Sequence, residues 1–290
     1  LSKKLKFSLP DLSRSKEYLN FVVPSIPSNL CHWIVSTSDR YLIGIFLSAT
    51  FVGYYNPGYS IGQLVPFLIA GVYGLVLPPT LSDYYEKGRM KELEQVLTLS
   101  LKYFFIISIP FFFGILLLYE PILTVLTGNA TIAAEGGVIA IYTAFSGLLY
   151  GIGVLFSQIL VIKKRTKIIG MKWTIAAAIN FGANIVLIPI LGIIGAAITT
   201  IIAYSITTVL TLYFSVVDEK DITFNLDYSS YSKILFSSVS MALLIYIIRQ
   251  NIWTNLFFLI VTGMITYFSI MYLIGGIDRK EIRFLKSLVG

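Results

Sequence analysis

The sequence predicts an all-α fold: a polytopic membrane helix bundle of about eight transmembrane helices. Its residues are 56% hydrophobic and only 13% charged, with a mean hydropathy of +0.81. In soluble domains about a quarter of the residues are charged. Several apolar segments reach the roughly 20 residues that a helix needs to cross the hydrocarbon core. Because these segments do not alternate with a period of two, a barrel is disfavoured.

The apolar segments and the charges between them predict both the spans and their orientation. The predicted spans are 18–41, 51–79, 97–119, 133–162, 169–189, 193–216, 233–250 and 253–275. Of the 22 basic residues, all but Arg40 and Arg249 fall on one side of the membrane in this arrangement. The positive-inside rule makes that side cytoplasmic. We therefore expect a multi-pass protein of the cell (cytoplasmic) membrane, with both termini of this chain cytoplasmic.

The first predicted span carries a polar stripe. Its members are spaced four, three, four and three residues apart: Ser25, Asn29, His32, Ser36 and Asp39. Residues at this spacing share one side of a helix. Arg40 follows directly, and ionised side chains inside a membrane tend to mark a pathway or a partner, since each costs roughly 2.5–3.5 kcal/mol on insertion scales.

Later spans repeat the pattern with hydroxyls and amides. The aligned polar residues are Tyr55, Tyr59 and Gln63 in the second span; Thr143, Ser146, Tyr150, Gly153 and Ser157 in the fourth; Asn180 and Asn184 in the fifth; and Thr200, Tyr204, Thr207 and Thr211 in the sixth. Each stripe also fits helix packing, as do the small-residue pairs Gly58/Gly62, Gly147/Gly151 and Gly192/Ala196. Several stripes together favour a polar, mostly uncharged cavity. The last two spans are uniformly apolar, so we expect them to be peripheral.

Between the second and third spans, residues 83–99 predict a cytoplasmic connector. A turn at Lys87-Gly88 is expected to lead into a short helix, whose Leu93, Val96 and Leu97 face the membrane surface. Pro57 and Pro66 are expected to interrupt the hydrogen-bond ladder of the second span.

The motifs that the sequence lacks narrow the function. It has no Walker A loop, no His-Glu-x-x-His and no nucleophile elbow, so we expect no catalytic residues, no cofactor and no enzyme activity. A single histidine excludes a multi-His metal site, and Cys31 is the only cysteine. The net charge of +7 comes from the loops and does not predict nucleic-acid binding. A channel would need a charge ring or a carbonyl filter, and neither is present.

Several stretches, in order and spacing, carry a family resemblance across residues 17 to about 217. They are Asp39-Arg40-Tyr-Leu-Ile-Gly, Val52-Gly53-Tyr54-Tyr55, Leu77-Pro78-Pro79-Thr80, Glu120-Pro121-Ile122-Leu123 and Gly192-Ile-Ile-Gly195-Ala196. In these the chain resembles the polysaccharide-biosynthesis (Wzx-type) flippases of lipid-linked oligosaccharides, in the superfamily that also contains multidrug antiporters and lipid II flippases.

The resemblance implies an architecture and a function. Residues 1–217 look like the six-helix C-terminal lobe of such a flippase, and 218–290 look like a cytoplasmic loop plus two trailing transmembrane helices. The N-terminal lobe of six spans would then lie upstream of Leu1. The resemblance also implies alternating access for a polyprenyl-diphosphate glycan, with glycosyltransferases or a polymerase of the same pathway as partners.

The candidate substrate-binding residues are Arg40, Asp39, His32, Tyr59, Gln63, Asn180 and Asn184. Arg40 is a candidate diphosphate ligand, or else it reaches for the outer interface. Asp39 and Arg40 are expected to point apart; Asp39 pairs with a helix end or a coupling cation, and His32 is a proton relay or a packed residue. Tyr59 and the three amides are candidate sugar contacts. The alternatives are a cation-coupled multidrug antiporter and, in another class, a membrane-embedded glycan-processing enzyme.

Overall fold

A computed structural model describes residues 25–218, 227–251 and 255–276, which are helical almost throughout and contain no strand. The long helices are α2 (Ser25–Phe46), α3 (Ala49–Glu86), α4 (Met90–Thr127), α6 (Val138–Ile162), α7 (Thr166–Leu191), α8 (Ile193–Leu212), α9 (Tyr228–Asn251) and α10 (Leu256–Leu273). A short helix, α5 (Ala130–Gly136), precedes α6, and a π-helical turn, η2 (Tyr213–Val217), extends α8. The predicted all-α bundle is confirmed.

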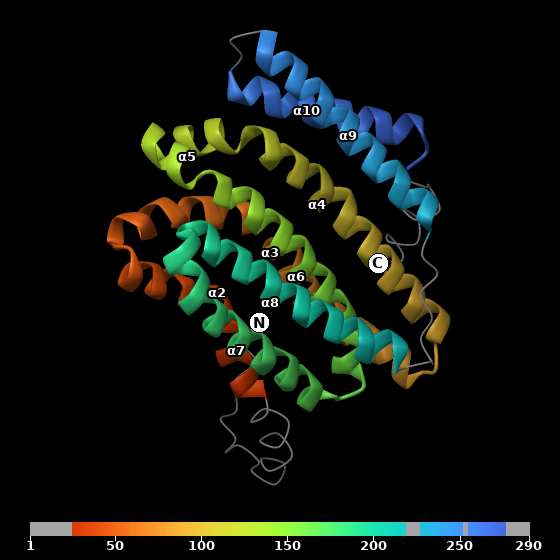
Figure 1. Cartoon of the computed structure of the whole chain (residues 1–290). Coiled ribbons are helices and arrows are strands. Elements are labelled where there is room, and N and C mark those ends of the chain that lie inside the picture. The colour runs from red at the N-terminus through yellow and green to blue at the C-terminus, as the bar shows by residue number, and fades with distance from the viewer. Residues whose placement is uncertain (1–24, 219–226, 252–254, 277–290) are drawn as a thin grey trace, which may run out of the picture.

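The helices form layers (Figure 1). Helices α2, α7 and α8 pack together on one side, α3 packs along α6 in the middle, and α4 lies against both. Helices α9 and α10 pair with each other on the outer side of α4. The position of this last pair agrees with the expectation that the final two spans are peripheral. One direct tether is the Tyr267 hydroxyl of α10, which donates to the Ile106 carbonyl of α4 at 2.8 Å.

The outer surface of the bundle suits a membrane. Seven helices of the described residues are long and apolar enough to cross one. Large apolar side chains are widely exposed on them, including Leu75, Ile190 and Leu273. Helix α2 is not among the seven because its polar stripe lowers its hydropathy. Residues 18–24 of the first predicted span lie outside the described residues.

Helices α3 and α6 approach closely because glycines line their contact. A Cβ added at Gly58 would lie 3.1 Å from the Ile139 Cβ of α6, and one at Gly62 would lie 2.1 Å from the Thr143 hydroxyl of α6. Neither position has room for a larger residue, so the predicted packing role of this pair is confirmed. Gly192 is different: it adopts φ +63° at the junction between α7 and α8, with open space around it.

The expectation of a separate connector helix between α3 and α4 is wrong. Each helix has 38 residues and is therefore about 57 Å long. Helix α3 continues through its four prolines without ending, and α4 begins at Met90, so no separate connector helix exists. The turn at 87–89 uses Gly88 at φ +69°.

The apolar residues at the start of α4 are buried and do not lie on the membrane surface. Leu93, Val96 and Leu97 form a core with Leu77 and Leu81 at the end of α3, to which α6 also contributes. Burial of this face explains why both helices extend so far beyond the hydrocarbon thickness: the antiparallel ends of α3 and α4 stabilise each other.

Candidate functional site

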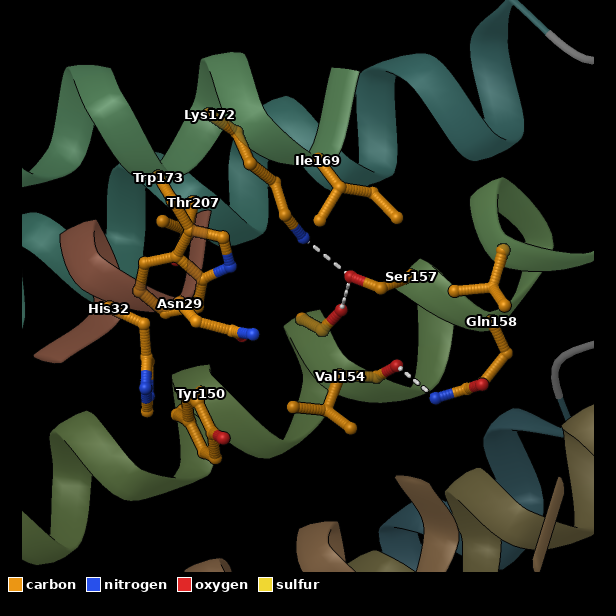
Figure 2. Close-up of a pocket in the computed structure, with 12 residues that line it drawn as sticks. Asn29, His32, Tyr150, Val154, Ser157, Gln158, Ile169, Lys172, Trp173 and Thr207 are labelled. Carbon is orange, nitrogen blue, oxygen red and sulfur yellow. Dashed lines mark hydrogen bonds between the residues drawn. The ribbon is translucent and has the colours of Figure 1, made fainter. Parts of the chain in front are cut away.

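A cavity of about 200 Å³ opens among α2, α6, α7 and α8. Its polar lining consists of Asn29, His32, Ser157, Gln158, Lys172 and Thr207. Figure 2 shows these side chains converging from separate helices. The polar stripes of α2, α6 and α8 thus line the same cavity. Only some residues of each stripe take part.

Lys172 is the charged residue that lines this cavity. It lies six residues past the start of α7, about 9 Å along the helix axis, and is only 2% exposed. Its ammonium donates to the Ser157 hydroxyl at 2.5 Å (Figure 2) and to the Thr211 hydroxyl at 2.6 Å. Within residues 25–218, 227–251 and 255–276, no carboxylate forms an ion pair with Lys172. Two hydroxyls therefore hold the Lys172 amino group, and the centre of the Trp173 ring lies 6.0 Å from its nitrogen.

The two hydroxyls are themselves fixed by their own helices. Ser157 donates to the Gly153 carbonyl at 2.6 Å, and Thr211 donates to the Thr207 carbonyl at 2.6 Å. Each therefore directs a lone pair at the ammonium. The π-helical turn η2 begins two residues after Thr211. Such turns often occur at functional sites.

Aromatic rings form one wall of the cavity. The His32 ring lies 4.6 Å from that of Trp173, edge to face, and 5.6 Å from that of Tyr150, stacked. Tyr150 in turn stacks on Phe67 at 4.5 Å, which holds its ring in place. In Figure 2 His32, Tyr150 and Trp173 gather on one side of the Lys172 ammonium, and Gln158 lies on the other. The cavity thus combines an aromatic wall with a lysine and amides.

A second polar cluster joins the end of α2 to the start of α3. Asp39 is fully buried and accepts from the Tyr55 hydroxyl at 2.5 Å. Arg40 is paired with it at 3.2 Å, so the expectation that these neighbours point apart is wrong. The guanidinium also donates to Asn56 at 2.7 Å and lies 4.2 Å from the centre of the Tyr59 ring. These contacts hold the Arg40 side chain against α2 and α3 and leave it 24% exposed.

The two asparagines of α7 form a third cluster, which is fully buried. The Asn184 amide donates to the Asn180 oxygen at 3.3 Å, and the same oxygen accepts from Ser38 of α2 at 3.4 Å. The Asn184 oxygen accepts from Thr199 of α8 at 2.5 Å. The cluster thus connects three helices, and in this conformation it does not line the cavity. A sugar-contacting role for these amides stays a prediction.

Gln63 lies between α3 and α6. Its amide donates to the Ser146 hydroxyl at 2.8 Å, and its side chain is 4% exposed. It too makes helix-to-helix contacts and does not line the cavity. Of the seven predicted substrate-binding residues, only His32 lines it; Asp39, Arg40 and Tyr59 share the second cluster.

Sequence reasoning missed Lys172 as a site residue. The positive-inside count places Lys172 with the other cytoplasmic basic residues, although it falls inside the predicted span 169–189. That position was the available signal, because a lysine within an apolar span is a functional candidate by default. Trp173 carried no signal of its own.

Helix α2 separates the polar cavity from an apolar groove. The groove has a volume of about 600 Å³ and lies between α2 and α7. Trp33, Tyr41 and Ile45 line it from α2, and Phe181 lines it from α7. These four side chains are all well exposed. A polar compartment and an apolar one therefore lie on either side of a single helix.

The fold and the site together define a polytopic helical membrane protein with a polar interior cavity, a class that includes carriers of polar or amphipathic molecules. Comparison with known proteins shows which proteins the chain is similar to. A family profile described as "Polysaccharide biosynthesis protein" matches residues 2–135. The chain is 25% identical over 285 residues to the probable low-salt glycan biosynthesis flippase Agl15 of Haloferax volcanii, covering 97% of this chain and 59% of that protein. The probable flippase AglR of the same organism is 25% identical over 189 residues, covering 63% of this chain and 38% of its own length.

A solved structure shares the fold. Lipid II flippase MurJ in an inward closed conformation matches with a TM-score of 0.70 and 19% identity, over 99% of this chain and 58% of that one. The resemblance to the polysaccharide-biosynthesis flippase family is confirmed by these comparisons. The chain spans less than two thirds of the length of each relative.

Proposed function

We propose that this chain forms the C-terminal lobe and two trailing helices of a flippase that moves a lipid-linked oligosaccharide across the cytoplasmic membrane for polysaccharide or glycoconjugate biosynthesis. The polar cavity inside an apolar bundle carries the proposal. Such a cavity suits a hydrated headgroup, and the groove beyond α2 suits the lipid chain. The named relatives, which are flippases, support the same function.

In this proposal the polar side of α2 is part of the pathway. His32 lines the cavity and Arg40 lies eight residues further along, so the stripe extends about 12 Å from the cavity to the second cluster. Arg40, held by Asp39 and stacked on Tyr59, is the proposed diphosphate ligand, because a guanidinium grips phosphate oxygens in pairs. Residues upstream of Leu1 would supply the opposing lobe, and the two lobes would alternate access by rocking.

The charge distribution supports an orientation for this pathway. The loops at 87–89 and 163–165 join helix ends on the side of the bundle where Lys172 lies, and both are basic. With the basic loops cytoplasmic, Lys172 lies toward the inner side and Arg40 toward the outer side. Both ends of this chain are then cytoplasmic.

A reconstituted transport assay tests the function. Purified full-length protein is placed in liposomes with a fluorescent polyprenyl-diphosphate oligosaccharide, and an impermeant reagent bleaches the label of the outer leaflet. We expect label from the inner leaflet to become accessible in the presence of protein and to stay protected in protein-free liposomes. Equal protection in both samples would overturn the proposal.

Two further arms separate the alternatives. Gradient-driven uptake of a cationic dye, without movement of the glycan, would indicate a multidrug antiporter. Release of a shortened or free glycan would indicate an enzyme. We expect neither.

A further inference from the structure

The cavity around Lys172 holds a buried cation without a protein counter-ion. Taking a charge out of water costs several kcal/mol even after relaxation, unless an opposite charge or hydrogen bonds compensate for it. Here two hydroxyls bond the ammonium, and no carboxylate of the described residues pairs with it. An ammonium has three donors, so one remains for a ligand in the cavity.

Other polar atoms at the cavity also lack protein partners. Within the part of the chain that the structure describes, His32 Nε2 and Gln158 Oε1 are buried and form no hydrogen bond. Both residues line the cavity, on opposite sides of the Lys172 ammonium (Figure 2). Unsatisfied buried polar atoms are uncommon in native proteins, and a hydroxylated ligand would satisfy both.

The cavity, with a volume of about 200 Å³, suits a small ligand such as one sugar ring. The aromatic rings of Tyr150 and Trp173, inclined to each other by 53°, offer apolar ring surface to the C–H groups of such a ring.

The number of charged residues at the cavity indicates how much negative charge a ligand can carry there. Lys172 is the one charged residue among those that line it, so the cavity balances a single negative charge. A carboxylate carries one, whereas a diphosphate carries at least two and is better matched by the planar donors of arginine.

We infer that this cavity is a subsite for one acidic monosaccharide of the transported glycan: its carboxylate lies on Lys172 and its ring lies on the aromatic wall. This inference rests on the proposed function and names a chemical feature of the substrate. Gln158 and His32 then bond the ring hydroxyls. The anion of the carrier's diphosphate is a separate group, for which Arg40 is the proposed ligand.

Binding of free monosaccharides tests the inference without any transport step. Trp33→Phe and Trp253→Phe leave Trp173 as the single tryptophan, a fluorescent reporter in the cavity wall. The purified protein in detergent is titrated with glucuronate, with glucose and with inorganic pyrophosphate. We expect glucuronate to change Trp173 emission with at least about tenfold higher affinity than glucose, the usual worth of a charge-assisted hydrogen bond.

Three variants test whether the preference for glucuronate over glucose depends on Lys172 and on the cavity. Lys172→Met is expected to reduce glucuronate affinity to that of glucose, while Lys167→Met, an exposed lysine on the same helix, leaves it unchanged. Val154→Phe fills the cavity and is expected to weaken both sugars, which keeps the test decisive if Lys172→Met folds poorly.

Equal affinity for glucuronate and glucose would overturn the inference, as would tighter binding of pyrophosphate than of glucuronate at this reporter. Loss of glycan transport in liposomes alongside intact glucuronate preference would overturn the proposed function and leave the subsite standing.

Discussion

Replacing Lys172 by methionine is predicted to leave the free energy of unfolding within about 1 kcal/mol of the wild type, because the substitution removes a costly charge together with its bonds. Lys172 is 2% exposed and forms two hydroxyl bonds. Hydrogen bonds to a charged group are worth about 1.5–3 kcal/mol each, or about 3–6 kcal/mol for the pair. Burial of the ammonium costs several kcal/mol, so the two contributions nearly offset.

The partners left behind do not alter this balance. Ser157 and Thr211 keep their bonds to the carbonyls of their own helices. Methionine has a similar length and shape, so no large cavity forms. The substitution therefore removes the ammonium from the cavity and leaves the packing of the bundle unchanged.

The assay is equilibrium unfolding in mixed micelles, followed by helical circular dichroism, with Lys167→Met as the matched control. We expect both variants to unfold near the wild-type midpoint and only Lys172→Met to lose glucuronate binding. A destabilisation above about 3 kcal/mol in Lys172→Met would refute the reasoning, since it would mean that the ammonium is a structural group whose bonds outweigh its burial.

Three further predictions concern stability. Asp39→Leu is expected to cost about 2–4 kcal/mol in micelle unfolding, because it leaves the neighbouring guanidinium without its ion-pair partner; an unchanged midpoint would show that this pair adds nothing. Gly62→Ala is expected to cost about 1–3 kcal/mol, since the new Cβ would lie 2.1 Å from α6, whereas Gly71→Ala on the same helix meets nothing within 4 Å; similar costs at both sites would contradict this. The hydrogen bond from Ser230 lowers the pKa of Asp227, which precedes α9, so its stabilising effect is present above its unfolded pKa and is lost as pH falls through the folded pKa. Ser230→Ala should therefore lose less thermal stability than the wild type between neutral and acidic pH, and equal losses would contradict the assignment.

The sequence was sufficient for the class of fold and for much of the helix order. Length and hydropathy located the long helices, and the uniform apolarity of the last two predicted their peripheral position. Pro57 and Pro66 remove backbone donors from the hydrogen-bond ladder, as expected, but α3 continues through both. Contacts with α6 and α4 along its length stabilise the helix despite the lost backbone donors.

The candidate site was less predictable, because a polar stripe does not indicate what it contacts. On α6, Thr143 and Ser146 bond backbone and Gln63, whereas Tyr150 and Ser157 line the cavity. All belong to one stripe with the same spacing. Which half packs and which half is open depends on where α3 and α7 cross α6, and that is set by tertiary contacts.

The position of Lys172 in the cavity could not be predicted from the sequence either. A basic residue near the end of a span fits the positive-inside pattern as well as it fits a buried site. Its depth is fixed by the start of α7 at Thr166 and by the hydroxyls of α6 and α8 that meet it. No local pattern around residue 172 contains that information.

The central claim is that the polar side of α2 faces an aqueous pathway, and thiol labelling measures this directly. In a Cys31→Ser background, Asn29→Cys lies at the cavity and Ile45→Cys lies in the apolar groove, and both positions are exposed. Because thiol reagents react with the thiolate, which forms in water and is suppressed in apolar surroundings, Asn29→Cys should react with a charged, impermeant reagent at least about tenfold faster than Ile45→Cys. Equal rates, or faster labelling at position 45, would contradict the account.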